Sequence, residues 1–306
     1  MGYQERDKHI VDYRMYELPG VAPYPGSGRF RGPPVVGSRY IACLGAAQTF
    51  GCFCAEPYPV LLSKVLGIQT LNLGYGGAGP TFHNSNPRLL GYINDAKVAI
   101  VQMMSARSQS NSLFRTRSHA RDGIRVSDGA VVTAERFYHD LALSQPDRLA
   151  DIVEETRENY VQNMLRLLRD ITPPKILFWF SVRHPEYTAS YRLPLARIFG
   201  GFPQLVNRPM VDRLRVAADR YVECVTSRGL PQQLLDRRGR PTSVVLQDDS
   251  GAYTIADDHN RYYPSPEMHM DGATALTESC DQLVGNEVFE PRPRGAPPRT
   301  ADIPEH

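Results

Sequence analysis

The sequence predicts an α/β fold, a three-layer α/β/α sandwich built on a mostly parallel five-stranded sheet. Five short apolar segments alternate with segments of helical periodicity, which is the pattern of strand–helix–strand units. The first apolar segment also runs into a turn between Gly45 and Gly51 that leads toward a helix, a layout typical of the binding edge of such a sheet. A chain of 306 residues is long enough for one large domain of this kind.

The predicted strands are apolar runs that stop at glycine, proline or polar residues. The run at 97–104 is almost continuously apolar, as expected for a parallel strand that is buried on both faces. The run at 175–181 contains Trp179, the only tryptophan of the chain. The five predicted strands span residues 39–44, 69–73, 97–104, 175–181 and 242–246.

The predicted helices follow from apolar spacing and from residues that begin or end helices. Proline at position 57 suits a helix start, and Gly229 suits a helix end. Apolar residues between 151 and 169 are spaced to line one helix face. The five predicted helices span residues 57–66, 86–95, 151–169, 211–228 and 273–284.

The chain divides into three parts on composition. Residues 1–38 are rich in Tyr, Pro, Gly and Arg and read as an irregular N-terminal arm. Residues 39–285 form the α/β domain, interrupted by a long polar excursion at 105–149 that is able to form a small cap. The Pro- and Arg-rich segment 286–306 is predicted to be a disordered tail.

Composition also limits the partners and the compartment. The net charge of +2 and the absence of a nucleic-acid motif argue against a nucleic-acid partner, and no apolar run approaches the roughly 20 residues that span a bilayer. The charged N-terminus lacks an apolar signal core, and five scattered cysteines do not form a disulfide framework, so a cytoplasmic location is expected. No ligand spacing for a metal is present, and a homo-oligomer stays open.

The carboxyl ends of parallel strands share one edge of a sheet, so the loops after the first three strands are expected to border a common pocket. The first of these loops offers Gln48 and Thr49 beside backbone N–H groups that suit an anion, and the alternative is a tight turn that needs small residues for packing. The second is glycine-rich, and Gly76 and Gly77 allow a ligand to approach the backbone closely.

The loop after the third strand is the most chemically distinctive. Hydroxyls, an amide and a guanidinium follow directly after a buried strand and suit a phosphate, a sulfate or sugar hydroxyls. The loop after the fourth strand adds a guanidinium and an imidazole at the same edge, although the histidine also reads as a loop residue with a structural role. The candidate binding residues of these two loops are Ser105, Arg107, Ser108, Ser110, Asn111, Arg183 and His184.

The first loop, Gly45-Ala-Ala-Gln-Thr-Phe-Gly51, resembles the opening motif of the SGNH hydrolases, Gly-Asp-Ser-x-Thr-x-Gly. The resemblance implies an SGNH/flavodoxin-like sandwich and ester chemistry. Here Ala47 stands where the family has its nucleophilic serine, and Ala46 stands where it has aspartate. The third loop also lacks the Gly-x-Asn-Asp block of that family.

SGNH hydrolases carry Asp-x-x-His before their last helix, where the histidine is the general base. His269 occupies a comparable place, with Glu267 and Asp271 as neighbouring carboxylates, although the spacing differs. This combination of motifs looks like an uncharacterised bacterial SGNH-like family without the catalytic serine. The segments that carry this second resemblance are 11–13, 45–51, 57–62, 71–79 and 105–112.

The sequence favours a group-transfer enzyme that modifies a carbohydrate or polysaccharide. Transfer from an activated anionic donor needs positioning, charge stabilisation and a base, but no protein nucleophile. Sulfo transfer is the favoured reaction, and a phosphosulfate or a nucleotide-type donor fits the third loop. Two alternatives stay open: a catalytically inactive polysaccharide-binding or assembly protein, and a carbohydrate esterase or acyltransferase with a displaced nucleophile such as Cys52 or Ser108.

Overall fold

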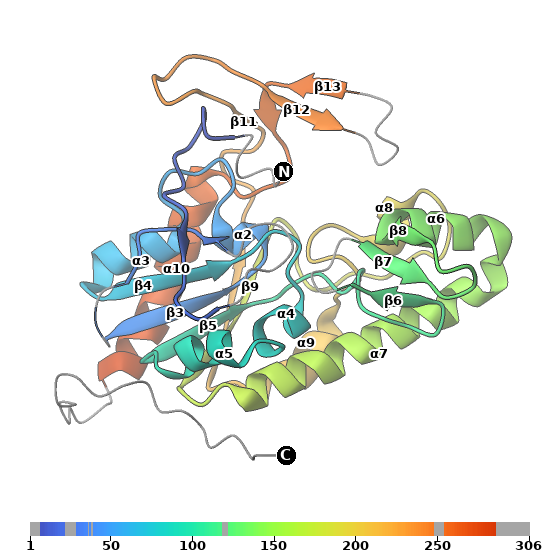
Figure 1. Cartoon of the computed structure of the whole chain (residues 1–306), viewed down its shortest axis with the longest axis horizontal. Helices are drawn as coiled ribbons and strands as arrows, with labels where there is room; N and C mark the ends of the chain where they lie inside the picture. Colours follow the sequence, from blue (N-terminus) through green and yellow to red (C-terminus); the bar gives the residue numbers. More distant parts are fainter. Residues whose placement is uncertain are drawn as a thin grey trace.

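A five-stranded parallel sheet lies at the centre of the computed structural model (Figure 1). The structure describes residues 7–21, 29–35, 37, 39–117, 122–247 and 254–285. In the order in which they lie, the strands are β10 (Arg220–Val225), β9 (Lys175–Ser181), β5 (Val98–Gln102), β3 (Tyr40–Gly45) and β4 (Gln69–Gly74). The predicted α/β sandwich is therefore confirmed.

Helices cover both faces of the sheet. On one face, α3 (Tyr58–Leu66) and α10 (Pro266–Gly285) pack on an apolar cluster that includes Ile41, Ile100 and Phe178. A larger apolar cluster covers the other face of the sheet, where α7 lies (Figure 1). The helices that contribute to it include α4 (Pro80–Asn84), α5 (Pro87–Asn94), α7 (Pro146–Asp170) and α9 (Arg208–Arg215).

The strand order places a switch point at the middle of the sheet. Numbered along the chain, the five strands lie in the order 2-1-3-4-5, so that the connections from β3 and from β5 leave toward opposite sides. In sheets of this order, ligands bind outside the carboxyl ends of the strands at that point. The loops after Gly45 and after Gln102 therefore border the expected site.

The fifth strand differs from the prediction. Residues 211–228 were expected to form one helix, but α9 ends at Arg215 and the chain returns as β10. Asp219 fixes this turn, because its carboxylate accepts from the Lys175 backbone N–H at 2.8 Å and its own N–H donates to the Lys175 carbonyl at 2.9 Å. The expected strand at 242–246 lies in β12 (Val244–Gln247), which pairs antiparallel with β13 (Thr254–Asp257) outside the main sheet.

Both long helices begin before their predicted first residues. The helix expected at 151 begins at Pro146, and the helix expected at 273 begins at Pro266. Proline fixes a backbone angle that suits the first turn, which explains both starts. As a consequence, Glu267, His269 and Asp271 lie on α10 and not in a loop before it.

The excursion at 105–149 has its own secondary structure. It contains an antiparallel three-stranded sheet of β6 (Phe114–Thr116), β7 (Asp122–Arg125) and β8 (Val131–Thr133), followed by α6 (Ala134–Ser144). In Figure 1 these elements lie together at the right, beyond the carboxyl ends of the main strands, with α8 (Leu195–Phe199) beside them. We refer to residues 105–144 as the cap.

Two short strand pairs lie outside the main sheet, one in the N-terminal arm and one in the C-terminal part of the chain. Within the arm, β1 (Tyr16–Glu17) pairs with β2 (Arg29–Phe30), so it is not free of regular structure as predicted. Near the C-terminal part, β11 (Gln232–Gln233) pairs with β14 (His259–Asn260), while the predicted tail at 286–306 lies outside the described residues. Within the described residues, no helix has the length and apolar character to cross a membrane.

Candidate functional site at the carboxyl edge of the sheet

The three loops predicted to meet do so at the switch point. The Ala46 N–H donates to Oε1 of Gln102 at 3.0 Å, which ties the first loop to the end of β5. The Tyr75 N–H donates to the Gly45 carbonyl at 3.0 Å, which ties the second loop to the first. A Cβ added at Gly79 would lie 2.8 Å from Nε2 of Gln109, so the second and third loops also touch.

Ala47, which stands where SGNH hydrolases have their nucleophilic serine, is buried. Ala46 and Ala47 are 5% and 6% exposed, and Ala47 packs in an apolar cluster with Tyr13 and Leu234. The displaced nucleophiles considered from the sequence are no better placed, since Cys52 and Ser108 are buried too. A serine-type ester attack at this position therefore has no support in the geometry.

The two polar residues of the first loop have different surroundings. Thr49 is fully buried, and its hydroxyl donates to Oε1 of Gln102 at 3.1 Å and lies 3.0 Å from the Tyr58 hydroxyl, so its contacts are structural. A Cβ at Gly45 would lie 2.2 Å from the Thr49 hydroxyl, which explains the glycine there. Gln48 is only 2% exposed, and its Oε1 has no hydrogen-bond partner among the described residues.

Most polar residues of the third loop hold the cap together. The Ser110 hydroxyl accepts from the Thr116 N–H at 3.0 Å, and the Ser108 carbonyl accepts from the Thr116 hydroxyl. The Asn111 amide donates to the Thr156 hydroxyl on α7 at 3.0 Å. The structure therefore places Ser108, Ser110 and Asn111 in structural contacts, which leaves Ser105 and Arg107 as the candidates of this loop.

Arg107 is the centre of a polar cluster at the sheet edge. Its guanidinium pairs with Oε1 of Glu135 in the first turn of α6 at 2.9 Å, and both side chains are about one-fifth exposed, at 23% and 21%. The next residue back, Ala106, donates its N–H to the Gln204 carbonyl at 3.0 Å. Gln204 in turn donates to the Tyr262 hydroxyl at 3.0 Å. We call Arg107, Glu135, Gln204 and Tyr262 the Arg107 cluster.

Two oxygen atoms of this cluster lack partners. Oε2 of Glu135 and Oε1 of Gln204 are buried without a hydrogen bond among the described residues. Burial raises the pKa of Tyr263, and the charge of Arg107 opposes this shift to a small extent. A buried acceptor without a donor is costly, so these oxygens favour a ligand that brings O–H or N–H groups.

Arg183 is not available to a ligand. Its guanidinium donates to the carbonyls of Gly201, His184, Pro203 and Val206, and it stacks over the Trp179 ring at 5.0 Å. Burial lowers the pKa of Arg183 to about 10. The predicted anion contact is therefore replaced by a structural one, in which Arg183 holds the loop between β9 and α9.

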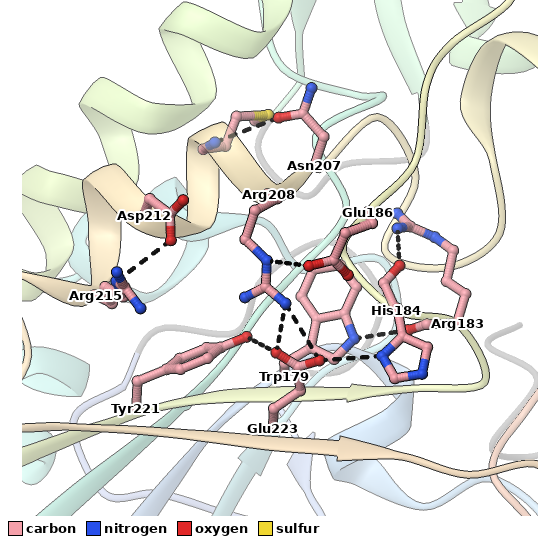
Figure 2. A network of polar contacts seen from close by, with 11 residues as sticks. Trp179, Arg183, His184, Glu186, Asn207, Arg208, Asp212, Arg215, Tyr221 and Glu223 are labelled. Carbon is pink, nitrogen blue, oxygen red and sulfur yellow. Dashed lines mark hydrogen bonds and ion pairs between the residues drawn. The ribbon is translucent and has the colours of Figure 1, made fainter.

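His184 belongs to a surface network that Figure 2 shows from close by. Its Nδ1 lies 3.4 Å from Oε1 of Glu223, and the ligand atoms of His184, Glu186 and Glu223 lie within 4.8 Å of one another. However, Arg208 pairs with Glu186 at 2.6 Å and with Glu223 at 3.1 Å. A guanidinium already neutralises both carboxylates, so this cluster does not suit a metal.

The predicted acid–base group is not assembled on α10. His269 is fully buried, and its Nδ1 accepts from the Tyr58 N–H at 3.2 Å, which caps the first turn of α3. Asp271 pairs with Arg228 at 2.6 Å, while Oε2 of Glu267 lies against Gly229. Burial lowers the pKa of His269 to about 3, with a smaller contribution from Arg31. A catalytic role for His269 stays a prediction, and the geometry favours a structural role.

Sequence reasoning missed Glu135, Gln204 and Tyr262. Neither a motif nor a regular spacing marks them, and they lie 28 or more residues from Arg107 along the chain. Glu135 pairs with Arg107, Gln204 bonds the neighbouring Ala106 backbone and Tyr262 bonds Gln204, because the cap and two long connections fold back over the same sheet edge. Gly76 and Gly77 stay as predicted in the second loop, where Gly77 is exposed and has a φ of 80°.

Comparison with known proteins identifies the family of this chain. The model of the domain of unknown function DUF6473 matches residues 1–125 and 134–284, and the chain belongs to this family. A comparison with curated proteins finds no match. Because the family is one of unknown function, the absence of serine as a family trait stays a prediction.

Among solved structures, the similar ones include enzymes that cleave esters, as do the SGNH hydrolases. A carbohydrate esterase family 2 enzyme with a carbohydrate-binding domain from Corynascus thermopiles (Myceliophthora fergusii) is 12% identical, with a TM-score of 0.37, over 85% of this chain and 70% of that one. A carbohydrate acetylesterase family member from Sinorhizobium meliloti is 12% identical, with a TM-score of 0.39, over 81% and 99%.

Proposed function

We propose that this member of the DUF6473 family transfers an anionic group, with sulfo transfer favoured, to a hydroxyl of a carbohydrate at the Arg107 cluster. The observation that carries the proposal is the pair between Arg107, in the loop after the central strand β5, and Glu135, one carboxylate oxygen of which has no hydrogen-bond partner among the described residues. No serine or cysteine nucleophile takes part, in agreement with the closed position of Ala47.

The pair supplies the two functions that such a transfer needs. Arg107 provides a planar set of donors for a sulfo or phosphoryl group. Glu135 Oε2 is placed to take the proton of the acceptor hydroxyl, whose oxygen attacks the sulfur while the sulfur–oxygen bond to the donor phosphate breaks. Glu135 thus replaces His269 as the base, because the Glu135 side chain is 21% exposed, whereas His269 is fully buried and its Nδ1 already accepts from the Tyr58 N–H.

The partnerless oxygens support a carbohydrate as the acceptor. Glu135 Oε2 and Gln204 Oε1 are both buried acceptors of this cluster, and sugar hydroxyls are donors that satisfy them. Tyr262 adds an aromatic ring that is 47% exposed and is held at its hydroxyl by Gln204. Such a ring suits the apolar face of a sugar.

A second function is favoured by a different observation. Ala47 is closed and His269 is neutral and buried, so the residues of an SGNH triad are absent or unusable. The same cluster in a non-catalytic protein would recognise a polysaccharide without changing it. The esterase alternative has the weakest support, because Ala47 and His269 offer neither a nucleophile nor an accessible base.

Titration with a nucleotide phosphosulfate, followed by calorimetry, tests the donor site. Arg107→Ala is expected to weaken binding at least tenfold, because the sulfo group loses its guanidinium partner. Arg115→Ala, at an exposed arginine of β6, is the matched control and is expected to bind as the wild type does. Equal binding by the Arg107→Ala variant would overturn the donor site.

Measuring group transfer distinguishes the proposed transferase from the non-catalytic polysaccharide-binding protein. Glu135→Gln keeps the size and one acceptor of the side chain, so donor binding is expected to persist while sulfo transfer to a polysaccharide falls by about 100-fold or more, as for loss of a general base. If the wild type binds polysaccharide but transfers no group from any donor, the non-catalytic function is the correct one. Release of acetate from an acetylated glycan would instead support the esterase.

A further inference from the structure

We propose that the ion pair between Arg107 and Glu135 is an autoinhibitory contact, which opens when an oxyanion binds to Arg107. The inference rests on the proposed function, in which Arg107 holds the sulfo group of the donor and Glu135 takes the proton of the acceptor. In the structure Arg107 Nη1 lies 2.9 Å from Oε1 of Glu135, so each group occupies the other. The pair therefore has to separate before both side chains meet their ligands.

Arg107 differs from the arginines that have structural roles, because its guanidinium is not enclosed by several acceptors. Within the described residues, the Arg107 guanidinium has one ion-pair partner, Glu135, and both side chains are about one-fifth exposed. By contrast, the Arg183 guanidinium donates to four carbonyls, and Arg208 pairs with two carboxylates. A single ion pair that solvent reaches contributes little to stability, so Arg107 and Glu135 are free to exchange partners.

The paired arrangement leaves one oxygen of Glu135 unsatisfied. Oε2 of Glu135 is buried and has no hydrogen-bond partner among the described residues. A buried, charged acceptor without a donor is costly, and this cost opposes the ion pair. When Glu135 turns away from Arg107, Oε2 becomes accessible to a water molecule or to the hydroxyl of an acceptor. The paired arrangement is therefore less stable than its short contact alone suggests.

An oxyanion competes with Glu135 for the same guanidinium. Arg107 lies in the loop after β5, at the switch point where ligands bind in sheets of this order. The N–H donors of a planar guanidinium match the oxygens of a sulfo or phosphoryl group. An anion bound there also repels the carboxylate of Glu135, because two like charges then lie within a few ångströms of each other. Since the anion needs the unpaired guanidinium, its binding shifts the equilibrium toward the open arrangement.

The contact sets the order in which the two substrates bind. The donor binds first and releases Glu135, and only then does the acceptor hydroxyl find a carboxylate that is not paired with Arg107. Coupling between two binding events is reciprocal, so the acceptor is also expected to strengthen the binding of the donor. This order is a property of the pair itself and needs no movement of a domain.

Substitution of Glu135 is expected to leave α6 folded. The Thr133 hydroxyl accepts from the Arg136 N–H at 3.1 Å, so the cap of this helix does not use the Glu135 side chain. Phe137 and Tyr138 are buried and hold the helix on its apolar side. The variants Glu135→Gln, of equal size, and Glu135→Ala, without the carboxylate group, are therefore suitable tests.

Binding of inorganic sulfate is measured by calorimetry at low ionic strength. Both variants are expected to bind sulfate at least tenfold more tightly than the wild type, because no carboxylate then competes for Arg107 or repels the anion. Arg107→Ala is expected to bind sulfate more weakly than the wild type. Asp140→Asn is the matched control, because Asp140 also lies on α6, is 24% exposed and pairs with Arg125 and Arg136. It removes the same charge away from Arg107, and its affinity for sulfate is expected to stay within twofold of the wild type.

The test separates this contact from the proposed function. Sulfate binding by Glu135→Gln and Glu135→Ala that is absent, or no tighter than in the wild type, overturns the contact even if the wild type transfers a sulfo group. Tighter binding that Asp140→Asn shows to the same extent also overturns it, since the effect is then one of total charge. Conversely, the expected pattern in a protein that transfers no group supports the contact while the proposed transferase fails. A crystal structure of the sulfate complex is expected to show Arg107 and Glu135 apart, and an intact pair beside a sulfate on Arg107 overturns the contact.

Discussion

Replacing Arg31 with methionine is expected to lower the free energy of unfolding by about 3–5 kcal/mol, because several buried carbonyls lose their donor at a cost of about 1–3 kcal/mol each. Arg31 is 2% exposed, and it lies in the arm before the main sheet. Its Nη1 donates to the carbonyls of Phe50 and Gly51 at 3.0 and 2.6 Å. Its Nη2 donates to the carbonyls of Cys54 and Ala55 at 2.7 and 2.8 Å.

These four bonds organise the connection between α2 (Ala47–Phe50) and α3. Within the described residues no carboxylate pairs with Arg31, so the four carbonyls and the rings of Tyr13 and Phe50 hold its charge. Methionine fills much of the volume but leaves the carbonyls without donors. The arm and the first loop are then expected to loosen together, because Arg31 links them.

Urea unfolding followed by circular dichroism gives the change in free energy. Arg29→Met is the matched control, because Arg29 has 48% of its side chain exposed and, within the described residues, pairs with the exposed Glu17. That change is expected to cost less than about 1 kcal/mol, as for a surface ion pair. A loss at Arg31 no larger than the loss at Arg29 would contradict the structural role. Arg31→Lys, which keeps the charge but cannot reach four carbonyls, is expected to fall between the two.

The fold could be predicted from the sequence because most of the central strands and helices are specified by residues within their own segments. The continuous apolar run that became β5 and the proline before α3 each specify one element without help from distant residues. The error at β10 has a physical cause. Residues 220–225 are mostly half-buried and show no clear alternation, and they follow α9, which ends at Arg215 without a glycine or proline, so a single longer helix was predicted.

The site was predictable only in part. The convergence of the three loops follows from parallel strands and was confirmed by the bonds of Ala46 and Tyr75. Whether a side chain faces a ligand or makes a structural contact depends on tertiary packing, which the spacing of residues along the sequence does not reveal. Arg107 and Arg183 both follow a buried strand, yet only Arg183 has its guanidinium enclosed by four carbonyls. The burial of His269 could not be predicted, because it depends on α10 starting about two turns earlier than expected.

Lowering the pH from about 6.5 to 4 is expected to destabilise the protein steeply, through two buried histidines. His83 and His269 are both fully buried. Burial lowers the pKa of His83 to about 4 and that of His269 to about 3. In the unfolded chain both pKa values return to about 6.5.

The sign of the effect follows from which state binds the protons. Above pH 6.5 both histidines are neutral in the folded and the unfolded chain, so their contribution to stability is fully present. Between pH 6.5 and the lowered values, only the unfolded chain binds protons, and each histidine removes about 1.4 kcal/mol per pH unit. With both groups acting, the free energy of unfolding is expected to fall by about 2.7 kcal/mol per pH unit between pH 6 and pH 4.5.

Two substitutions test this slope while keeping one hydrogen bond each. In His269→Asn, the new Oδ1 replaces Nδ1 as the acceptor of the Tyr58 N–H, and in His83→Gln, the new Nε2 replaces the ring Nε2 that faces the Leu73 carbonyl. Each variant is expected to lose about half of the slope, since one titrating group is gone. Urea unfolding at pH 8, where neither histidine binds a proton in either state, gives the packing cost of each change separately. A double variant that still loses stability as steeply as the wild type between pH 6 and 4.5 would mean that other groups control the acid sensitivity, and that these imidazoles accept protons within the folded protein.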